Sequence, residues 1–201
     1  KLRVTLKFTP GWYDFSQTIY LPSYVTIEGS GINKTIFNYT GTGNAFEFIN
    51  DNSYYDDGTG TFVRDVFANT RYISQPKHAR LANFSLATNT YNVTGLLLNA
   101  VRDSEFENIE ILGAWTPNSP MEMTGFGINL IALSAIVTSQ RNKFKNIICN
   151  KVRAGVFSKH DIFNNSFDQC SFSNSYYGVS FGHGSSGMED SGEQFGPRKN
   201  R

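Results

Sequence analysis

The chain has 201 residues, enough for one domain with a buried core. Its 17 Phe and 10 Tyr exclude a disordered chain, and its net charge of +1 argues against nucleic acid as the main partner, because phosphate contacts need a basic surplus. No apolar run approaches the roughly 18 residues of a membrane-spanning helix, so we expect no membrane insertion.

Short runs of alternating apolar and polar residues fill the first 45 residues, and prolines and glycines separate the runs. Alternation with a period of two predicts β-strands, and the steps rich in proline and glycine predict sharp turns. The runs cover residues 4–6, 10–13, 19–23, 25–31 and 35–37. We therefore expect short strands joined by tight turns in this part of the chain.

A pattern of apolar, any, amide, apolar, any and apolar residues then occurs four times, beginning at Leu81, Phe106, Phe144 and Phe167. Each copy is followed by a glycine and a second apolar alternation, of which residues 46–48 are a looser, earlier copy. A repeat of several short strands without an amphipathic helix is typical of a β-solenoid, whose coils hydrogen-bond to each other about 4.8 Å apart. The sequence therefore predicts an all-β chain wound into about six coils.

The amide at the third position of each copy has a specific physical role. Asn tolerates the left-handed backbone conformation that a sharp corner needs. Stacked side-chain amides can also hydrogen-bond to each other from coil to coil. We therefore predict a structural ladder made by Asn83, Asn108, Asn146 and Gln169.

The first runs and the coil repeat together resemble the pectin-lyase-like superfamily of right-handed parallel β-helices. The turn at 10–13 and the motif L-P-S-x-V-T-I-x-G-x-G at 21–31 look especially like the versions in bacteriophage tailspikes and tail fibres. The resemblance implies one single-stranded right-handed parallel β-helix domain over 1–201, with opening coils over 1–45 and repeating coils over 46–181. It also implies an extracellular virion tail component that forms a homotrimer and contacts other virion proteins.

Two excursions interrupt the regular coils, at 49–80 and 112–126. In a solenoid, insertions project from the corners and often build the binding surface. We expect the two excursions to wall a groove whose floor is the second alternation. Its outward positions are Glu47, Leu97, Asn129, Phe157 and Ser180.

Aromatic faces beside carboxylates and amides suit the stacking and hydrogen bonding of sugar rings. We therefore expect the protein to bind host cell-surface polysaccharide. The alternatives are an active polysaccharide depolymerase, either a lyase or a glycoside hydrolase, and a structural surface shaft whose aromatics only pin the excursions to the coils. The candidate substrate-binding residues are Trp115, Tyr54, Tyr55, Asp56, Asp57, Glu47, Asn129 and His160.

One local motif points to catalysis. Residues 182–186 resemble the G-H-G-x-S motif of polygalacturonase-type glycoside hydrolases, and coil alignment puts His160 under His183 with Asp161 adjacent. Asp161 and His183 are thus the candidate catalytic residues. That family also has an N-T-D motif and an Asp pair, where this chain has K-H-D at 159–161 and I-A-L at 131–133. Glycoside hydrolysis needs two carboxylates, so the sequence leaves enzymatic activity open.

The sequence predicts no cofactor, with Ca²⁺ as the one alternative. Asp56 and Asp57 could supply carboxylate ligands, but a calcium site wants six or more oxygens, and Asp-Asp-Gly more often marks a turn. Cys149 and Cys170 lie in adjacent predicted coils two residues out of register, so we expect free, buried thiols. No amide motif closes the coil over 182–201, so we expect an unfinished coil of a longer chain.

Overall fold

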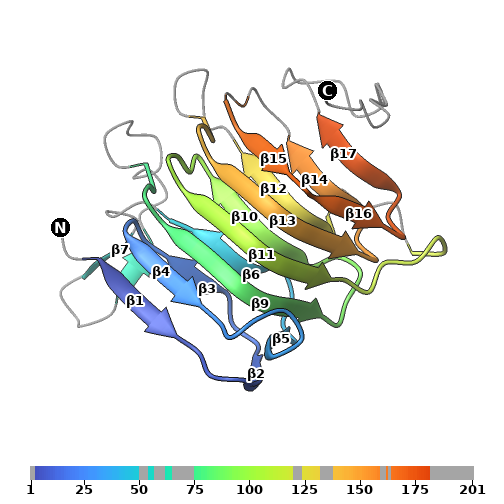
Figure 1. The fold of residues 1–201 in the computed structure, drawn as a ribbon, viewed down its shortest axis with the longest axis horizontal. Coiled ribbons are helices and arrows are strands. Elements are labelled where there is room, and N and C mark those ends of the chain that lie inside the picture. The colour runs from blue at the N-terminus through green and yellow to red at the C-terminus, as the bar shows by residue number, and fades with distance from the viewer. Residues whose placement is uncertain are drawn as a thin grey trace.

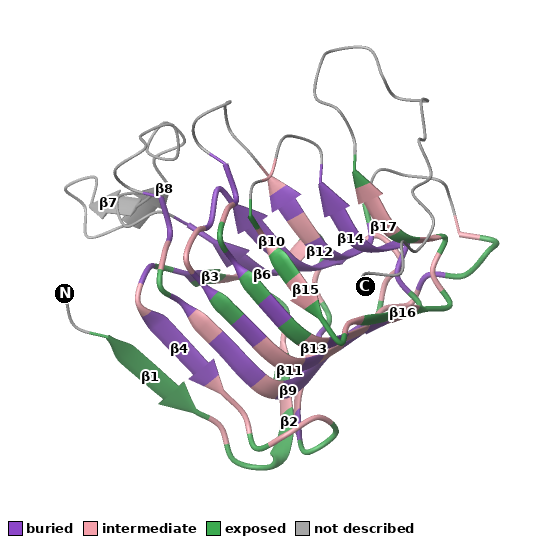
Figure 2. Cartoon of the chain, turned by 45° about the horizontal axis from the view of Figure 1, so that its top comes forward, coloured by how far each residue is buried: buried purple, intermediate pink, exposed green. Residues whose placement is uncertain are grey.

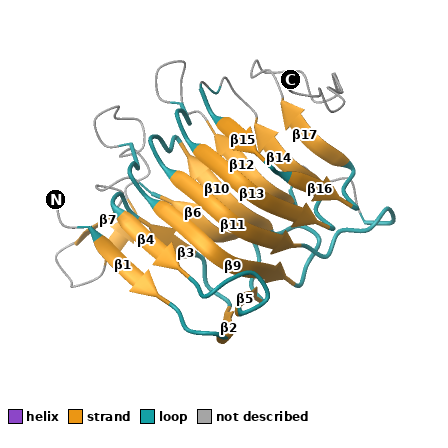
Figure 3. Cartoon of the chain, in the orientation of Figure 1, coloured by secondary structure: helices purple, strands orange, loops and turns teal. Residues whose placement is uncertain are grey.

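The computed structural model describes residues 3–49, 75–119, 124–131, 138–158, 162 and 164–181, and the backbone of 54–56 and 62–64. In these ranges every regular element is a β-strand (Figures 1 and 3). The strands form a nine-stranded sheet, a six-stranded sheet and one hairpin. The prediction of an all-β chain is therefore confirmed, and within the described ranges no helix long and apolar enough to cross a membrane is found.

All strand pairs in the two main sheets are parallel. Six strands of the large sheet follow the order β1 (Val4–Lys7), β4 (Val25–Glu28), β9 (Arg80–Thr88), β11 (Glu105–Leu112), β13 (Lys143–Asn150) and β15 (Ser166–Asp168). Three more strands extend it: β16 (Ser171–Ser173) pairs with β13, β5 (Thr35–Tyr39) pairs with β9, and β2 (Gly11–Phe15) pairs with β5. The small sheet has the order β3 (Ile19–Leu21), β6 (Asn44–Phe48), β10 (Thr94–Asn99), β12 (Phe126–Ile131), β14 (Ala154–Ser158) and β17 (Tyr177–Phe181).

From β9 onward the chain alternates between the two sheets, and each strand pairs with strands of the previous and next visits to the same sheet. In the large sheet Phe106 lies opposite Leu81 and Phe144, and in the small sheet Ile128 lies opposite Leu96 and Val156. These are the pairings that the sequence repeat predicts. Each sheet is open at its two edges. The described strands therefore establish two parallel sheets and do not by themselves establish a solenoid.

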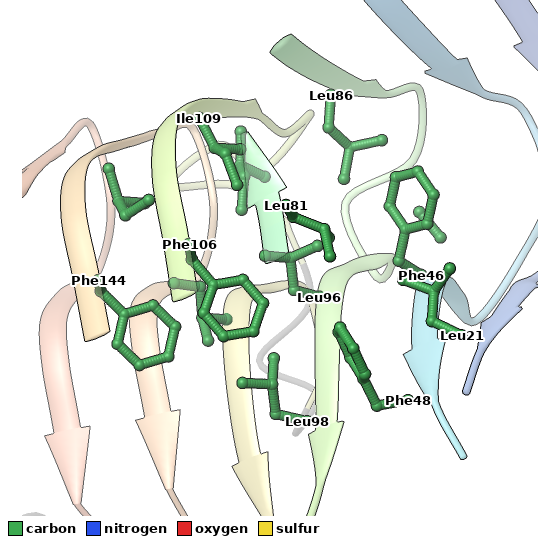
Figure 4. Packing of buried hydrophobic residues seen from close by; sticks show 14 of the residues in the cluster. Leu21, Phe46, Phe48, Leu81, Leu86, Leu96, Leu98, Phe106, Ile109 and Phe144 are labelled. Atoms are coloured by element: carbon green, nitrogen blue, oxygen red, sulfur yellow. The ribbon is translucent and has the colours of Figure 1, made fainter. Parts of the chain in front are cut away.

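The hydrophobic core lies between the two sheets (Figure 4). Phe106 and Phe144 from the large sheet and Leu96 and Leu98 from the small sheet are at most 1% exposed. The Phe106 and Phe144 rings stack with centroids 4.8 Å apart, as expected for identical side chains in register on adjacent parallel strands. Burial of each such side chain stabilises the fold by about 1.5–3 kcal/mol.

The repeated glycines lie inside strands of the small sheet. A Cβ atom on Gly127 would lie 2.6 Å from the Cys149 Sγ atom and 2.7 Å from the Gly155 carbonyl oxygen. A Cβ atom on Gly155 would lie 2.2 Å from the Phe172 ring. The glycines therefore face the core and allow the two sheets to approach closely.

The amide row bends the long strands of the large sheet. Asn83, Asn108, Asn146 and Gln169 all adopt left-handed φ angles between 50° and 63°. The Asn108 Nδ2 atom donates to the Asn83 Oδ1 atom, and the Asn146 Nδ2 atom donates to the Asn108 Oδ1 atom, both at 2.9 Å. At Asn83, Asn108 and Asn146 the strand continues through the bend, and pairing resumes on both sides of it. At Gln169 the bend separates β15 from β16, and both still pair with β13.

A second row of left-handed residues has no common side-chain type. Tyr24, His78, Asp103, Arg141 and Asn164 share φ angles between 51° and 63°. They precede the strands of the large sheet, where the chain returns from the small sheet. Because their side chains differ, the sequence offers no repeat that predicts this corner.

Each cysteine is free, which agrees with the prediction. Cys149 lies opposite Phe172 rather than opposite Cys170. Cys149 is fully buried, whereas Cys170 is partly exposed. Burial raises the pKa of both thiols above the ordinary value, so both are protonated at neutral pH.

Candidate functional site

The expected floor residues lie in one row on the outer face of the small sheet. Parallel register places Leu97 between Glu47 and Asn129, and places Phe157 between Asn129 and Ser180. They alternate with side chains that enter the core, so the row faces away from it. The β-strand period therefore brings two predicted site residues, Glu47 and Asn129, to one face.

The strands β6, β10 and β14, which carry three residues of the row, are buried along nearly all of their length (Figure 2). Glu47 is 5% exposed, Leu97 is 9% exposed and Phe157 is 8% exposed. The Glu47 Oε2 atom accepts a hydrogen bond of 3.1 Å from Asn44 Nδ2. The outer face of the small sheet is thus a covered surface rather than the open groove floor that the sequence suggested.

Trp115 is also buried, with 6% exposure. Its backbone N–H donates to the Lys151 carbonyl oxygen at 2.8 Å, which ties the segment after β11 to the segment before β14. Its ring meets the half-exposed Tyr176 ring edge to face, with centroids 6.1 Å apart. Tyr176, more than Trp115, therefore presents an aromatic face to solvent.

Five aromatic side chains form a contiguous group that we call the aromatic cluster. Phe126 and Phe157 stack at 4.3 Å, and Tyr177 packs against them. Tyr177 meets Tyr176 at 4.5 Å, and Tyr176 meets Trp115. Phe126 and Tyr177 begin β12 and β17, so the cluster lies where these parallel strands start.

Arg153 lies beside this cluster, directly before β14. Its backbone N–H donates to the Gly125 carbonyl oxygen at 2.7 Å, and its carbonyl oxygen accepts from the Tyr177 N–H at 2.9 Å. The side chain is 8% exposed, and its Nε and Nη1 atoms are buried without a hydrogen-bond partner. Buried polar groups are nearly always hydrogen-bonded, so this arginine requires an explanation.

Three further residues carry a buried polar atom without a hydrogen-bond partner: Trp115 Nε1 in the aromatic cluster, and Asn129 Oδ1 and Asn99 Oδ1 in strands β12 and β10 of the small sheet. Leaving such a group buried without a partner costs about 1–3 kcal/mol. Buried donors and acceptors without partners thus occur both in the aromatic cluster and along the small sheet.

The Tyr177 hydroxyl is held in its neutral form. Burial, the largest cause, and the neighbouring Tyr176 raise the pKa of Tyr177, while the positive charge of Arg153 opposes the shift. The phenol therefore stays protonated at neutral pH and can donate a hydrogen bond.

For seven predicted site residues the structure describes no side chain. Tyr54, Tyr55 and Asp56 form β7 (Tyr54–Asp56), which pairs antiparallel with β8 (Phe62–Arg64), and only their backbone is described. The remaining candidates, Asp57, His160, Asp161 and His183, lie outside the described residues.

The residues that the structure describes contain no group of three or more His, Cys, Asp or Glu side chains that could hold a metal ion. The Asp56 and Asp57 carboxylates, on which the calcium alternative depends, are not among the described side chains.

Sequence reasoning missed Arg153, Tyr176 and Tyr177. The sequence repeat could have identified two of them, because Arg153 and Tyr176 each lie two residues before a repeated glycine. Residues at that position lie at the edge where the small-sheet strands begin. A search along the repeat for charged and aromatic residues there would have found them.

No protein-family model matches the chain, and no curated protein sequence matches it. Among solved structures, the chain is similar to ORF18 of Geobacillus virus E2, with a TM-score of 0.54 and 13% sequence identity. The similarity covers 84% of this chain and 34% of the viral protein, so this chain spans about a third of that protein's length. At this identity the likeness concerns the fold alone.

Proposed function

We propose that this chain is part of a bacteriophage tail spike or tail fibre that binds a polysaccharide on the host cell surface. The observation that carries the proposal is the aromatic cluster with its unpartnered polar atoms on the outer face of the small sheet. Sugars offer apolar ring faces and hydroxyl groups at once, so they complement both features.

Two further observations support a phage tail protein. The fold is similar to that of a viral protein, ORF18 of Geobacillus virus E2. The motif at 21–31 resembles that of phage tailspikes. A virion component of this kind would be displayed outside the cell, work as a homotrimer and contact other virion proteins.

The same proposal includes a right-handed parallel β-helix of the pectin-lyase type. It is supported by the alternation of the chain between two parallel sheets and by the shared register of successive visits. Crossovers between parallel strands of one sheet are right-handed in nearly all proteins. The left-handed corner rows would then lie along the edges of the helix.

Binding to purified capsule or lipopolysaccharide from the host and from a resistant strain tests the function. We expect saturable binding to host material only, and release of new reducing ends in the same assay would add a depolymerase activity. Absence of binding to host glycan would contradict the proposal.

A matched pair of variants tests where the glycan binds. We expect Tyr176→Ala to lower glycan affinity by at least about tenfold, because it removes the half-exposed ring on which a sugar would stack, and a contact of about 1.4 kcal/mol corresponds to a factor of ten. The control is Trp12→Ala, which removes a 59% exposed ring on β2 in the large sheet. Equal affinity of both variants would remove the aromatic cluster from the proposal. Tyr176→Phe keeps the ring, so it should bind like the parent chain.

Sedimentation of the full chain addresses assembly. A trimer is the expected species, and a stable monomer would contradict the tail-spike assignment.

A further inference from the structure

The two main sheets share two open edges. Strands β1, β2 and β3 lie at one of them, which we call the first edge, and β15, β16 and β17 lie at the opposite one, which we call the last edge (Figure 1). Within the described part of the chain, each of these six strands pairs with a neighbour on one side only. A row of N–H and C=O groups without a neighbouring strand is a template for pairing with another chain.

Apolar side chains on both edges point toward the core and yet meet solvent. Val4 and Leu6 lie opposite the buried residues Val25 and Ile27, but they are 55% and 46% exposed. On the last edge, Phe181 is 44% exposed. Apolar surface is more stable away from water, so both edges favour a partner that covers them.

The two edges end the same rows of core residues. In the large sheet, one row runs across the strands from Leu6 to Phe167. In the small sheet, another row runs from Ile19 to Val179. Because all strand pairs in these rows are parallel, a shift along the rows that carries one edge onto the other keeps the strand direction and the register.

The charges on the outer face of the large sheet follow the same geometry. Opposite charges occupy neighbouring strands, as in the ion pair of Glu107 with Lys145. The row through these two residues begins at the exposed Lys7 and ends at the exposed Asp168. A strand added beside β1 would continue the pattern with an acidic residue opposite Lys7, and β15 carries such a residue in the matching register.

We propose that the first edge of one copy of this chain docks on the last edge of a second copy, with the strands parallel and in the register of the shared rows. In this register Phe167 meets Leu6, Asp168 meets Lys7 and Val179 meets Ile19. The contact joins two different surfaces, so it repeats from copy to copy instead of closing. It uses neither the aromatic cluster nor the proposed glycan contacts.

Pairing of like edges is the less favourable alternative. Pairing of β1 with β1 of another copy would bring Lys7 near its own equivalent, and pairing of β15 with β15 would do the same with Asp168. Like charges on adjacent strands are destabilising. The charges therefore select the first edge against the last edge.

Sedimentation velocity of the full chain over a range of concentrations tests the contact. We expect an open series of species whose mass rises with concentration. The series starts from the particle that the chain forms at low concentration, so the result does not depend on whether that particle is a trimer or a monomer. A mass that stays constant as the concentration rises would overturn the proposal.

Charge reversal tests the register. Lys7→Glu and Asp168→Lys each place like charges at the contact, so each alone should lower the association constant by at least about tenfold. In an equimolar mixture of the two variants, every mixed contact again joins an acidic and a basic side chain. Association should therefore return in the mixture, although neither variant associates well alone.

Lys143→Glu is the matched control. It makes the same change in charge and also places like charges on neighbouring strands, because Lys143 lies opposite Glu105, but β13 is not an edge strand. It should associate like the parent. Circular dichroism verifies the fold of each variant, and Asp168→Asn, which should weaken association to a smaller extent, replaces any reversal variant that does not fold.

The outcomes are distinct. Undiminished association of the Lys7→Glu and Asp168→Lys variants would assign self-association to another surface. Absence of recovery in the mixture would overturn the register, and an equal loss in Lys143→Glu would reduce the effect to net charge. Each of these results would overturn the edge contact and leave the proposed glycan binding intact.

Discussion

The outer faces of the two sheets follow the same alternation but differ in what they present. The large sheet exposes charged residues that form ion pairs between adjacent strands, such as Lys143 with Glu105 at 3.5 Å and Lys145 with Glu107 at 3.6 Å. The small sheet presents Glu47, Leu97 and Phe157, each less than 10% exposed. The outer face of the large sheet therefore meets solvent with paired charges, whereas these residues of the small sheet are shielded from solvent.

The largest expected effect of a substitution on an outer face is that of Phe157→Ala. Phe157 is 8% exposed and stacked on Phe126, so its removal should cost about 3 kcal/mol of unfolding free energy, as for a core phenylalanine. Urea denaturation measures this loss. A cost below 1 kcal/mol would place the residue on an ordinary surface and remove the contrast between the faces.

The bend within the large sheet should be the next most sensitive feature. Asn108→Ala removes both amide hydrogen bonds of the ladder and places a residue without the polar side chain that tolerates left-handed backbone at a φ of 52°. We expect a loss of about 2 kcal/mol in the same denaturation assay. Asn108→Gly keeps the left-handed backbone at low cost, so it should lose less; a larger loss for glycine would show that φ is not the cause.

The ion pair of Asp103 with Arg141 makes stability depend on pH at the second corner row. The hydrogen bond from Arg141 lowers the pKa of Asp103 below its ordinary value of 3.8. Because the folded-state pKa is depressed, the stabilisation is complete above about pH 4 and is lost as pH falls through the lowered pKa.

The wild-type protein should therefore exceed Arg141→Gln in stability by no more than about 1 kcal/mol at pH 6, since both groups are partly exposed. The difference should shrink toward pH 2 in acid denaturation series. A difference that grows on acidification would contradict the assigned ion pair.

The smallest effect is expected for the exposed charges of the large sheet. Lys143→Ala breaks an ion pair whose side chains are 71% and 55% exposed, so the loss should be about 0.5 kcal/mol or less. Raising the salt concentration should erase the difference from wild type. A loss as large as that of Phe157→Ala would make the two outer faces equivalent.

The sequence predicted the parts of the fold that depend on repetition. Aligning the four amide motifs in the sequence gives the observed register of β9, β11, β13 and β15. Each motif contains an apolar alternation with a period of two and an amide at a fixed position, and both can be recognised from sequence alone. The corner through Tyr24, His78 and Asp103 could not be predicted, because these residues share a left-handed backbone where the chain enters the large sheet but have unlike side chains.

The site was predicted only in part. The alternation of the strands correctly placed Glu47 and Asn129 on one face of the small sheet. The burial of Glu47 could not be predicted, because it depends on what covers that face and not on the sequence of the strand itself. Trp115 was named as a candidate for sugar binding, with packing of the excursion as the alternative, and it lies buried in contact with Tyr176. The unpartnered Arg153 could be found only from the three-dimensional arrangement of its neighbours.

The in-register stacking of successive visits to one sheet is the central claim, and paired cysteines test it most directly. Glu107 lies opposite Lys145, so Glu107→Cys with Lys145→Cys should oxidise to an intramolecular disulfide that peptide mass spectrometry identifies. Glu105→Cys with Lys145→Cys is displaced by two residues, or about 7 Å along the strand, and should not. Crosslinking of the displaced pair in preference to the aligned pair would contradict the register and the arrangement of both outer faces.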